Sequence, residues 1–405
     1  MLPSSRAPIV NQLVVYKVGS ADETFGQTGI AHFLEHMMFK GTAALGPGEF
    51  SRTIRRNGGR DNAYTDFDAT GYHQTIASDR LELVMRLEAD RMDGLRIVEK
   101  ELTPEREVVL EERRMRIDNA PAALLDEAVR AVLFGEHKPY GMPTAGYVDD
   151  VRKLGVEDLM AFYRRFYSPD NAVLIVAGDT TADAVHKLAE KYYGPVPGRS
   201  HGPRLRPSEG GINLPQRITR ADRRVAEPGW SRDYLAPSYR TGETRHAYAL
   251  QVLARLFGGG ETSRLWRALV AEQRLALSAS ADYSASSLGL SSFGLNIHPA
   301  SNRTTELESA VSEQMKKLLD GNVTTEEVER AQNRLLAAAI YAQDSLASGP
   351  RRYAAALSTG NSAADVEAWP QRIAAVRAAD VIAAAQHVWR DDGLVTSLLT
   401  PGEDR

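Results

Sequence analysis

The sequence predicts an α+β protein built from two domains of similar organisation. The chain has 405 residues, which is too long for one ordinary hydrophobic core and suits two domains of roughly 200 residues each. Strand-like and helix-like segments follow a similar order in the two halves, so we expect an internal duplication despite little sequence identity. Between residues 194 and 216 the composition changes to Pro, Gly, Arg and Ser, as in a linker. We therefore expect domains at residues 1–205 and 206–405.

The first half begins with an expected strand at Ile9–Val18 and a helix that opens near Thr28, whose apolar residues recur at helical spacing. A strand region covers Arg60–Ala77. A charge-rich helical region follows from residue 80 to about residue 117, with Pro104 expected at the first position of a helix. The remaining elements of this half are a helix at 156–167, a strand at 172–177 and a helix at 183–193.

The second half repeats this order. Thr324, with Glu327 three residues later, forms a capping box that predicts the start of a helix at residue 325. The other expected elements are a strand near 226–236, helices at 246–257 and 263–272, strands within 276–297, and helices at 304–319 and 325–342.

The composition excludes several classes of protein. The formal net charge is −4 with mixed signs, so no field would gather nucleic acid or an anionic membrane. There is no cysteine, which excludes disulfides and thiolate metal sites. No run of about 18 apolar residues exists, and the first residues lack the apolar stretch of a signal peptide. We expect a soluble protein with no nucleic-acid or membrane partner, cytoplasmic, or periplasmic if a signal has been removed.

A metal-binding pattern lies on the first expected helix, where the sequence reads His32-Phe-Leu-Glu35-His36. Residues four apart share a helix face, so the two imidazoles can bind one metal ion. Glu35 can hold and deprotonate a metal-bound water without being a ligand. This H-x-x-E-H order is that of the inverzincins. A zinc hydrolase site uses three protein ligands and an open position for water, so a third ligand must come from elsewhere.

A second helix is rich in carboxylates around Glu105 and Glu112. These two residues are seven apart, which is two helical turns, and so lie on one face. A solvated surface helix would explain the neighbouring charges Glu107, Glu111 and Arg113 equally well.

At these residues the chain resembles the pitrilysin/insulinase family of zinc peptidases, in particular the small two-domain bacterial members related to mitochondrial processing peptidase. In that family a glutamate ligand follows H-x-x-E-H after about 75 residues, with a second glutamate seven positions earlier. Here 112 − 36 = 76, so 75 residues intervene. Further segments similar to the family are Val18–Asp22, Gly29–Thr42, Leu87–Met92, Pro139–Gly141, Tyr167–Ala172 and Leu275–Ser278.

The resemblance implies a fold of two similar domains, each a mostly antiparallel sheet covered by helices. It implies Zn²⁺ on His32, His36 and Glu112, with Glu35 as general base and Glu105 as an auxiliary catalytic carboxylate. It further implies that the stretch Asn62, Ala63, Tyr64 and Thr65 is an exposed edge strand that pairs with an extended peptide substrate. The alternative for Tyr64 is a structural role, in which its ring packs against the protein and does not contact the substrate.

The family's substrate-clamping Arg and Tyr, seven residues apart in the C-terminal domain, are not found here. The matching positions hold Leu269 and Ala276. We therefore expect a heterodimer in which a related two-domain partner supplies these donors. The alternative is a homodimer that uses residues such as Arg267 or Tyr283. Rival functions are a non-catalytic scaffold subunit and a zinc-stabilised binding protein without turnover.

Overall fold

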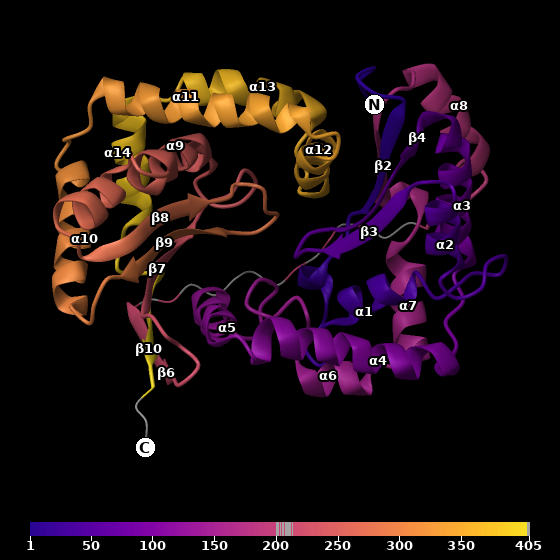
Figure 1. The fold of residues 1–405 in the computed structure, drawn as a ribbon, viewed down its shortest axis with the longest axis horizontal. Coiled ribbons are helices and arrows are strands. Elements are labelled where there is room, and N and C mark those ends of the chain that lie inside the picture. Colours follow the sequence, from indigo (N-terminus) through magenta and orange to yellow (C-terminus); the bar gives the residue numbers. More distant parts are fainter. Residues whose placement is uncertain (200–201, 203, 205, 207–211, 213, 403–405) are drawn as a thin grey trace. The chain divides into compact units, whose positions relative to one another are not determined.

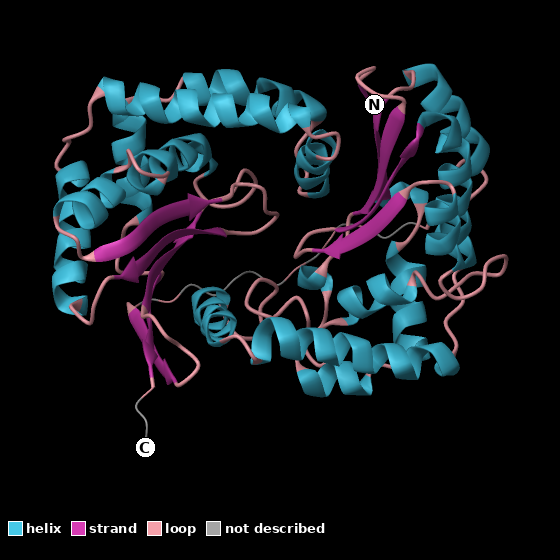
Figure 2. Ribbon diagram, in the orientation of Figure 1, coloured by secondary structure: helices cyan, strands magenta, loops and turns pink. Residues whose placement is uncertain are grey.

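The computed structural model describes residues 1–199, 202, 204, 206, 212 and 214–402. The chain forms two compact units, each with one five-stranded sheet and its own helices (Figures 1 and 2). The first unit contains residues 1–114, 142–207 and 342–363, and the second contains 115–141, 208–341 and 364–405. The α+β fold class is confirmed.

The sheet of the first unit has the strand order β1-β5-β2-β4-β3. Only the β1–β5 pair is parallel, and the other three pairs are antiparallel. Strand β2 lies in the middle and is buried along nearly its whole length, which explains its almost continuous apolar sequence. The strands are β1 (Leu2–Pro3), β2 (Ile9–Tyr16), β3 (Arg60–Thr65), β4 (Thr70–Ala77) and β5 (Ala172–Gly178).

Helices cover both faces of this sheet. On one face Val14, Tyr16 and Tyr72 pack with residues of α1, α4 and α7. On the other face Leu13 and Val15 pack against a residue of α12. The helices of this unit are α1 (Ile30–Met37), α2 (Glu49–Arg56), α3 (Leu81–Gly94), α4 (Glu99–Arg113), α6 (Val148–Lys153), α7 (Val156–Phe166), α8 (Ala182–Tyr192) and α12 (Ser348–Ser358).

The second sheet repeats the topology of the first. Its order is β6-β10-β7-β9-β8, which is the first order with five added to each strand number. Again only the pair at one edge, β6–β10, is parallel. The expected duplication is confirmed. The elements are β6 (Gln216–Asp222), β7 (Gly229–Ala236), β8 (Ala276–Tyr283), β9 (Ser291–Pro299), β10 (Leu394–Pro401), α5 (Pro121–Phe134), α9 (Ala247–Gly258), α10 (Thr304–Leu319), α11 (Thr325–Tyr341), α13 (Ala363–Ala374) and α14 (Ala378–Val388).

Each unit contains a helix from the opposite half of the sequence. Helix α12 packs on strands β2 and β5 of the first unit, and helix α5 packs on strands β6, β7 and β10 of the second. The domain limits at residues 1–205 and 206–405 therefore remain a prediction. Much of the predicted linker lies outside the described residues. Its Arg204 and Arg206 form partly buried ion pairs with Asp22 and Asp68 in the first unit.

The segment Leu87–Met92 contains a buried ion pair between Glu88 and Arg91. The Arg91 guanidinium binds both carboxylate oxygens of Glu88, and neither side chain is more than 1% exposed. The guanidinium lies 4.2 Å from the centroid of the Phe50 ring and 4.3 Å from that of Tyr72. Cation–π contacts and charge-assisted hydrogen bonds together offset the cost of burying the two charges.

Several sequence-based boundaries were wrong. Pro104 lies inside α4, because the helix begins a turn earlier at Glu99 with acidic residues in its first turn. The missing Pro104 N–H leaves the carbonyl of the exposed Lys100 to be hydrated. The region 263–272 is mainly a π-helical segment, Trp266–Glu272. The strand region predicted at 60–77, by contrast, is correct and forms a hairpin of two strands, β3 and β4.

Nine of the helices and strands in the described part of the chain were not predicted, namely β1, β6, β10, α2, α5, α6, α12, α13 and α14. The capping box was predicted correctly. The Glu327 N–H donates to Thr324 Oγ1 at 3.2 Å, and the Thr324 N–H donates to Glu327 Oε2 at 3.1 Å.

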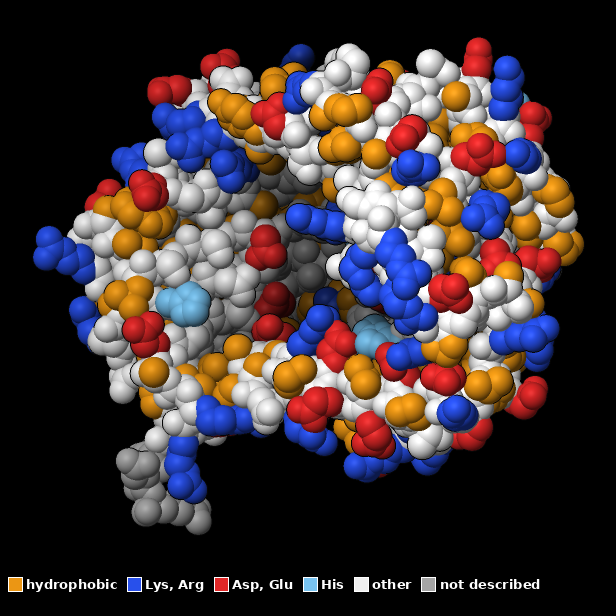
Figure 3. Space-filling view, turned by 45° about the vertical axis from the view of Figure 1, so that its right-hand side comes forward, with side chains coloured by type: hydrophobic (Ala, Val, Ile, Leu, Met, Phe, Trp, Pro, Cys, Tyr) orange, Lys and Arg blue, Asp and Glu red, His pale blue; other side chains and the backbone are white. Residues whose placement is uncertain are grey.

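The surface agrees with the mixed charge of the sequence. On the face drawn in Figure 3, Lys and Arg side chains are interspersed with Asp and Glu. None of the helices in the described part of the chain has the length and apolar character needed to cross a membrane.

Candidate metal centre

Helix α1 has a buried apolar stripe and, opposite it, a partly exposed polar stripe. Ile30, Phe33, Leu34 and Met37 are at most 3% exposed, and this spacing fixes the rotation of the helix about its axis. His32, Glu35 and His36 therefore lie on the remaining stripe, where the side chains of His32 and His36 are 12% and 18% exposed.

The start of α1 is held by a backbone position that requires glycine. Gly29 has φ of 85°, and a Cβ there would lie 2.9 Å from the carbonyl oxygen of Ala145. A side chain would therefore be strained at this residue and would also clash.

A buried carboxylate satisfies the first N–H groups of α1. Glu23 accepts hydrogen bonds from the N–H of Gly29 at 2.8 Å and of Ala31 at 2.9 Å. Burial raises the pKa of Glu23 well above its usual value, and the two N–H bonds lower it only in part. Sequence reasoning missed Glu23, because an acidic residue seven positions before the first residue of a helix gives only a weak capping signal.

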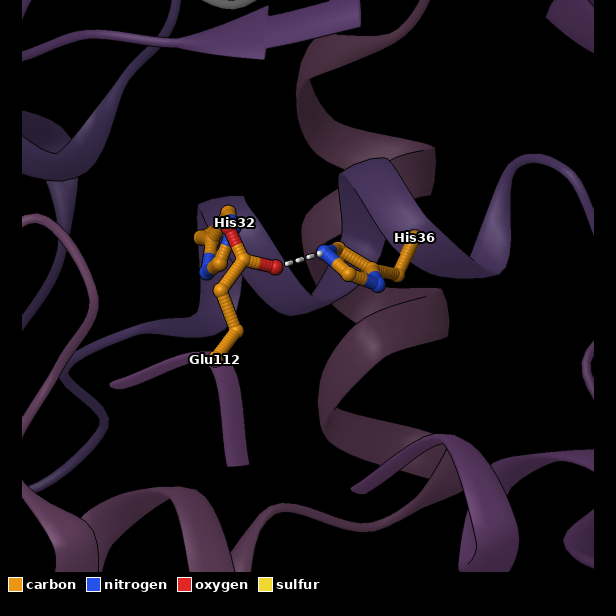
Figure 4. Close-up of side chains that lie close together, drawn as sticks. All are labelled: His32, His36 and Glu112. Atoms are coloured by element: carbon orange, nitrogen blue, oxygen red, sulfur yellow. Dashed lines mark ion pairs between the residues drawn. The ribbon is translucent and has the colours of Figure 1, made fainter. Parts of the chain in front are cut away.

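Helix α4 brings the third member of the site. Glu105 and Glu112 lie on one face of α4, and a π-helical segment, Arg114–Asp118, follows directly. Figure 4 shows the Glu112 carboxylate lying between the two imidazole rings. Its oxygens lie 3.7 Å from His32 Nε2 and 3.3 Å from His36 Nε2. The ring centroids of His32 and His36 are 4.8 Å apart, with planes at 83°.

These donors fit a tetrahedral zinc ion. Two ligand atoms on one Zn²⁺ with bonds of 2.0–2.2 Å lie about 3.3 to 3.6 Å apart. The ligand atoms of His32, His36 and Glu112 all lie within 4.8 Å of one another, and this is the single such group found among the described residues. Two imidazole nitrogens and one carboxylate are also a ligand set of catalytic zinc.

The electrostatics of His36 also favour a cation at this point. Burial lowers the pKa of His36, but the hydrogen bond to Glu105 and the charges of Glu112, Glu105 and Glu35 outweigh it, so the pKa is raised. A cation between His36 Nε2 and Glu112 is therefore stabilised, and a metal ion would compete with the proton for that position.

Glu105 holds the other side of the His36 ring. His36 Nδ1 lies 2.9 Å from Glu105 Oε1, and Lys40 Nζ forms an ion pair with Glu105 Oε2. Burial raises the pKa of Glu105, but the bonds to His36 and Lys40 dominate and lower it. An ionised Glu105 accepts the Nδ1–H of His36 and leaves the Nε2 lone pair for a metal. Sequence reasoning missed Lys40, although its position four residues after His36 was a usable signal.

Strand β3 reaches the site at its last residue. Thr65 Oγ1 donates a hydrogen bond to Glu35 Oε2 at 2.5 Å. The N–H of Ala63 donates to the Asn62 side-chain oxygen at 2.9 Å, so it points to the open edge and not to β4. The Tyr64 ring packs on Gly71, where a Cβ would lie 2.5 Å from it.

In the second unit, the two positions that match the family's Arg and Tyr are apolar and buried. Leu269 and Ala276 belong to the hydrophobic core of this unit and are 0% and 4% exposed. Arg267 is exposed, whereas the Tyr283 hydroxyl donates to the carbonyl oxygen of Pro237 at 2.5 Å.

Comparisons with known proteins match the chain to a family of peptidases. The model of the insulinase family, peptidase family M16, matches residues 2–146, and the model of the peptidase M16 inactive domain matches residues 153–335. Zinc protease PqqE of Helicobacter pylori is 34% identical over 67% of this chain and 61% of its own length. An uncharacterised zinc protease of Mycobacterium leprae is 32% identical over 82% of this chain and 74% of its own length.

A solved structure agrees with the fold. The crystal structure of a protease from Helicobacter pylori matches with a TM-score of 0.90 and 28% identity, over 98% of this chain and 95% of that chain. From the sequence matches and this structural match together, the chain belongs to the insulinase family of peptidases, family M16.

Proposed function

We propose that the chain is the catalytic subunit of a zinc metalloendopeptidase that hydrolyses extended or unfolded peptides. The observation that carries this proposal is the convergence of His32, His36 and Glu112, with Glu35 on the same stripe of α1. A non-catalytic scaffold would have no use for four such residues held in one place.

In this proposal each residue has a distinct task. His32, His36 and Glu112 would hold the ion, which when bound supplies a Lewis acid that acidifies water and polarises the peptide carbonyl. Glu35 accepts the proton of the attacking water and returns it to the leaving amine. Glu105, paired with Lys40, keeps the His36 ring oriented.

The open edge of β3 is the proposed peptide-binding strand. It is an edge strand of the first sheet, and its Ala63 N–H is bonded only to a neighbouring side chain, so a peptide carbonyl can replace that contact. Pairing through the backbone tolerates many sequences but requires an extended segment. We propose backbone contacts for Asn62 to Thr65, whereas the Tyr64 ring has a packing role.

The partner proposal rests on the second unit. Leu269 and Ala276 are buried and apolar, so neither can donate a hydrogen bond to a developing oxyanion. Removing one such donor costs roughly a hundredfold to a thousandfold in rate. We propose that a related two-domain subunit supplies the donors. In the homodimer alternative Arg267 is available, whereas the Tyr283 hydroxyl already donates to Pro237.

The zinc ligands are tested by Glu112→Gln. We expect zinc affinity to fall at least about a hundredfold, because an amide oxygen is a weaker ligand than a carboxylate and even loss of a ligand's hydrogen-bond partner can cost this much. The measurement is competition with a chromophoric chelator. Glu111→Gln is the matched control, since Glu111 is exposed and pairs with Arg114. Unchanged affinity in Glu112→Gln would move the third ligand elsewhere.

The base is tested by Glu35→Gln. Zinc content should stay at the wild-type level while peptide turnover falls roughly a hundredfold to ten-thousandfold, because the proton acceptor is lost and the ligands remain. Zinc analysis and a peptidase assay with and without chelator measure both quantities. A zinc-binding protein without turnover would show no chelator-sensitive cleavage in the wild type.

The peptide-binding strand is tested by Ala63→Pro, which removes the outward N–H. We expect the KM for an unfolded peptide to rise roughly two- to tenfold, the worth of one hydrogen bond. Ala63→Ser keeps the N–H and should retain the wild-type KM. Equal KM values for all three proteins would exclude Ala63 from substrate pairing.

The heterodimer is tested by purifying the chain alone. It should bind zinc but cleave unfolded peptides poorly, and co-expression with a related subunit that carries the Arg and Tyr should raise the rate at least about a hundredfold. Full activity of the isolated chain would contradict this proposal and favour the homodimer.

A further inference from the structure

We propose that Thr65 is a positioning residue for the general base Glu35, in place of a side-chain contact to the substrate. The inference rests on the proposed function. It follows from one contact, the hydrogen bond that Thr65 Oγ1 donates to Glu35 Oε2 at 2.5 Å. A hydroxyl has a single proton, so a Thr65 side chain bonded in this way cannot donate to a peptide at the same time.

A hydrogen bond from Thr65 can set the orientation of the Glu35 carboxylate. The last torsion of a glutamate side chain is broad and does not select one orientation of the carboxylate plane. The backbone of α1 fixes the Cα of Glu35 through the buried stripe of the helix, but it does not fix the carboxylate oxygens. A short hydroxyl–carboxylate bond is charge-assisted and is stronger than a neutral one, so it can set that orientation.

Thr65 is itself held firmly. It pairs with Thr70 at the end of the β3–β4 hairpin, and the buried Thr70 hydroxyl donates to the carbonyl oxygen of Val18 at 3.0 Å. The turn that follows Thr65 is closed by the N–H of Asp66 donating to the carbonyl oxygen of Ala69 at 2.8 Å.

The same turn is tied to the loop before α1. The N–H groups of Ser20 and Ala21 donate to the carbonyl oxygens of Asp66 and Phe67 at 3.0 and 2.9 Å. The hydroxyl of Thr65 is therefore presented to Glu35 from a fixed backbone, as a positioning role requires.

Strand β3 then has two separate tasks. In an antiparallel ladder the N–H groups of alternate residues point to opposite edges. The N–H of Asp66 points into the hairpin and that of Ala63 points outward, so the backbone of Thr65 also faces the open edge. Its backbone is available for peptide pairing while its hydroxyl holds the base. This arrangement places the peptide-binding edge and Glu35 in fixed relation to each other.

Thr65→Val and Thr65→Ser test the inference in the zinc-loaded protein, assayed in its active assembly. Valine keeps the branched shape and removes the hydroxyl, so kcat should fall roughly ten- to a hundredfold, the worth of a hydrogen bond to a charged group. KM and zinc content should stay within about twofold of the wild type. Serine keeps the hydroxyl and should restore most of kcat. A raised KM with unchanged kcat in Thr65→Val would instead make Thr65 a substrate contact.

A double variant shows whether Thr65 acts through Glu35. In the Glu35→Gln background, Thr65→Val should cause no further loss of kcat, because the group that it orients is already absent. A further tenfold loss there would overturn the inference. The parallel comparison of wild type and Glu35→Gln tests the role of Glu35 as the base, since equal rates would remove that role whatever the effect of Thr65→Val.

Crystal structures of the zinc-loaded variants test, without any activity measurement, whether Thr65 sets the orientation of the Glu35 carboxylate. The Glu35 carboxylate should keep its orientation in Thr65→Ser and rotate in Thr65→Val. An unmoved carboxylate in Thr65→Val would overturn the inference even if the chain proved to have no peptidase activity.

Discussion

The burial of one stripe of α1 is the constraint on which the site depends. Because Ile30, Phe33, Leu34 and Met37 must face the core, the rotation of the helix is fixed and the opposite stripe carries His32, Glu35 and His36. The axial position of the helix is fixed as well, by Glu23 at its first N–H groups. The packing of the apolar stripe therefore also fixes the positions of the three polar side chains on the opposite stripe.

The two units share a topology but differ at the helix that follows the second strand of each sheet. In the first unit this helix, α1, has one partly exposed stripe that carries His32 and His36. In the second unit the corresponding helix, α9, is buried on nearly all sides, by residues such as Leu250, Leu253 and Phe257. A helix that is apolar all round has no stripe left for histidines. Among the residues that the structure describes, duplication of the fold therefore did not duplicate the group of His32, His36 and Glu112.

The charged side chains around the site lie next to partners of opposite charge. Glu112 and Glu105 both approach His36 and favour positive charge on or beside its ring. Lys40 neutralises Glu105 from the outside, so the carboxylate stays ionised and acts as an acceptor for the imidazole. The arrangement suits a cation between His36 and Glu112 and needs no further positive side chain there. Edge strand β3 completes the site because its terminal hydroxyl lies against Glu35.

The sequence by itself determined the elements of the site that depend on local spacing. His32, Glu35 and His36 lie within little more than one helical turn, so their common face follows from helix geometry alone. The seven-residue separation of Glu105 and Glu112 likewise placed both on one face of α4. The repeated order of strands and helices was readable too, because period and turn residues are local signals.

Only the tertiary structure decided which elements meet. Glu112 lies 76 residues after His36 and 80 after His32. Its approach to the two histidines depends on how α4 packs against α1, and spacing alone could not distinguish this from a solvated helix. The same holds for Glu23, Lys40 and the contact between Thr65 and Glu35, and for the packing of α12 on the first sheet. Pro104 shows the reverse case, in which the local preference of proline for the first position of a helix was overridden, since α4 begins at Glu99 and continues through Pro104. Contacts between residues far apart in sequence are set by complementary packing of whole elements, and no local pattern encodes them.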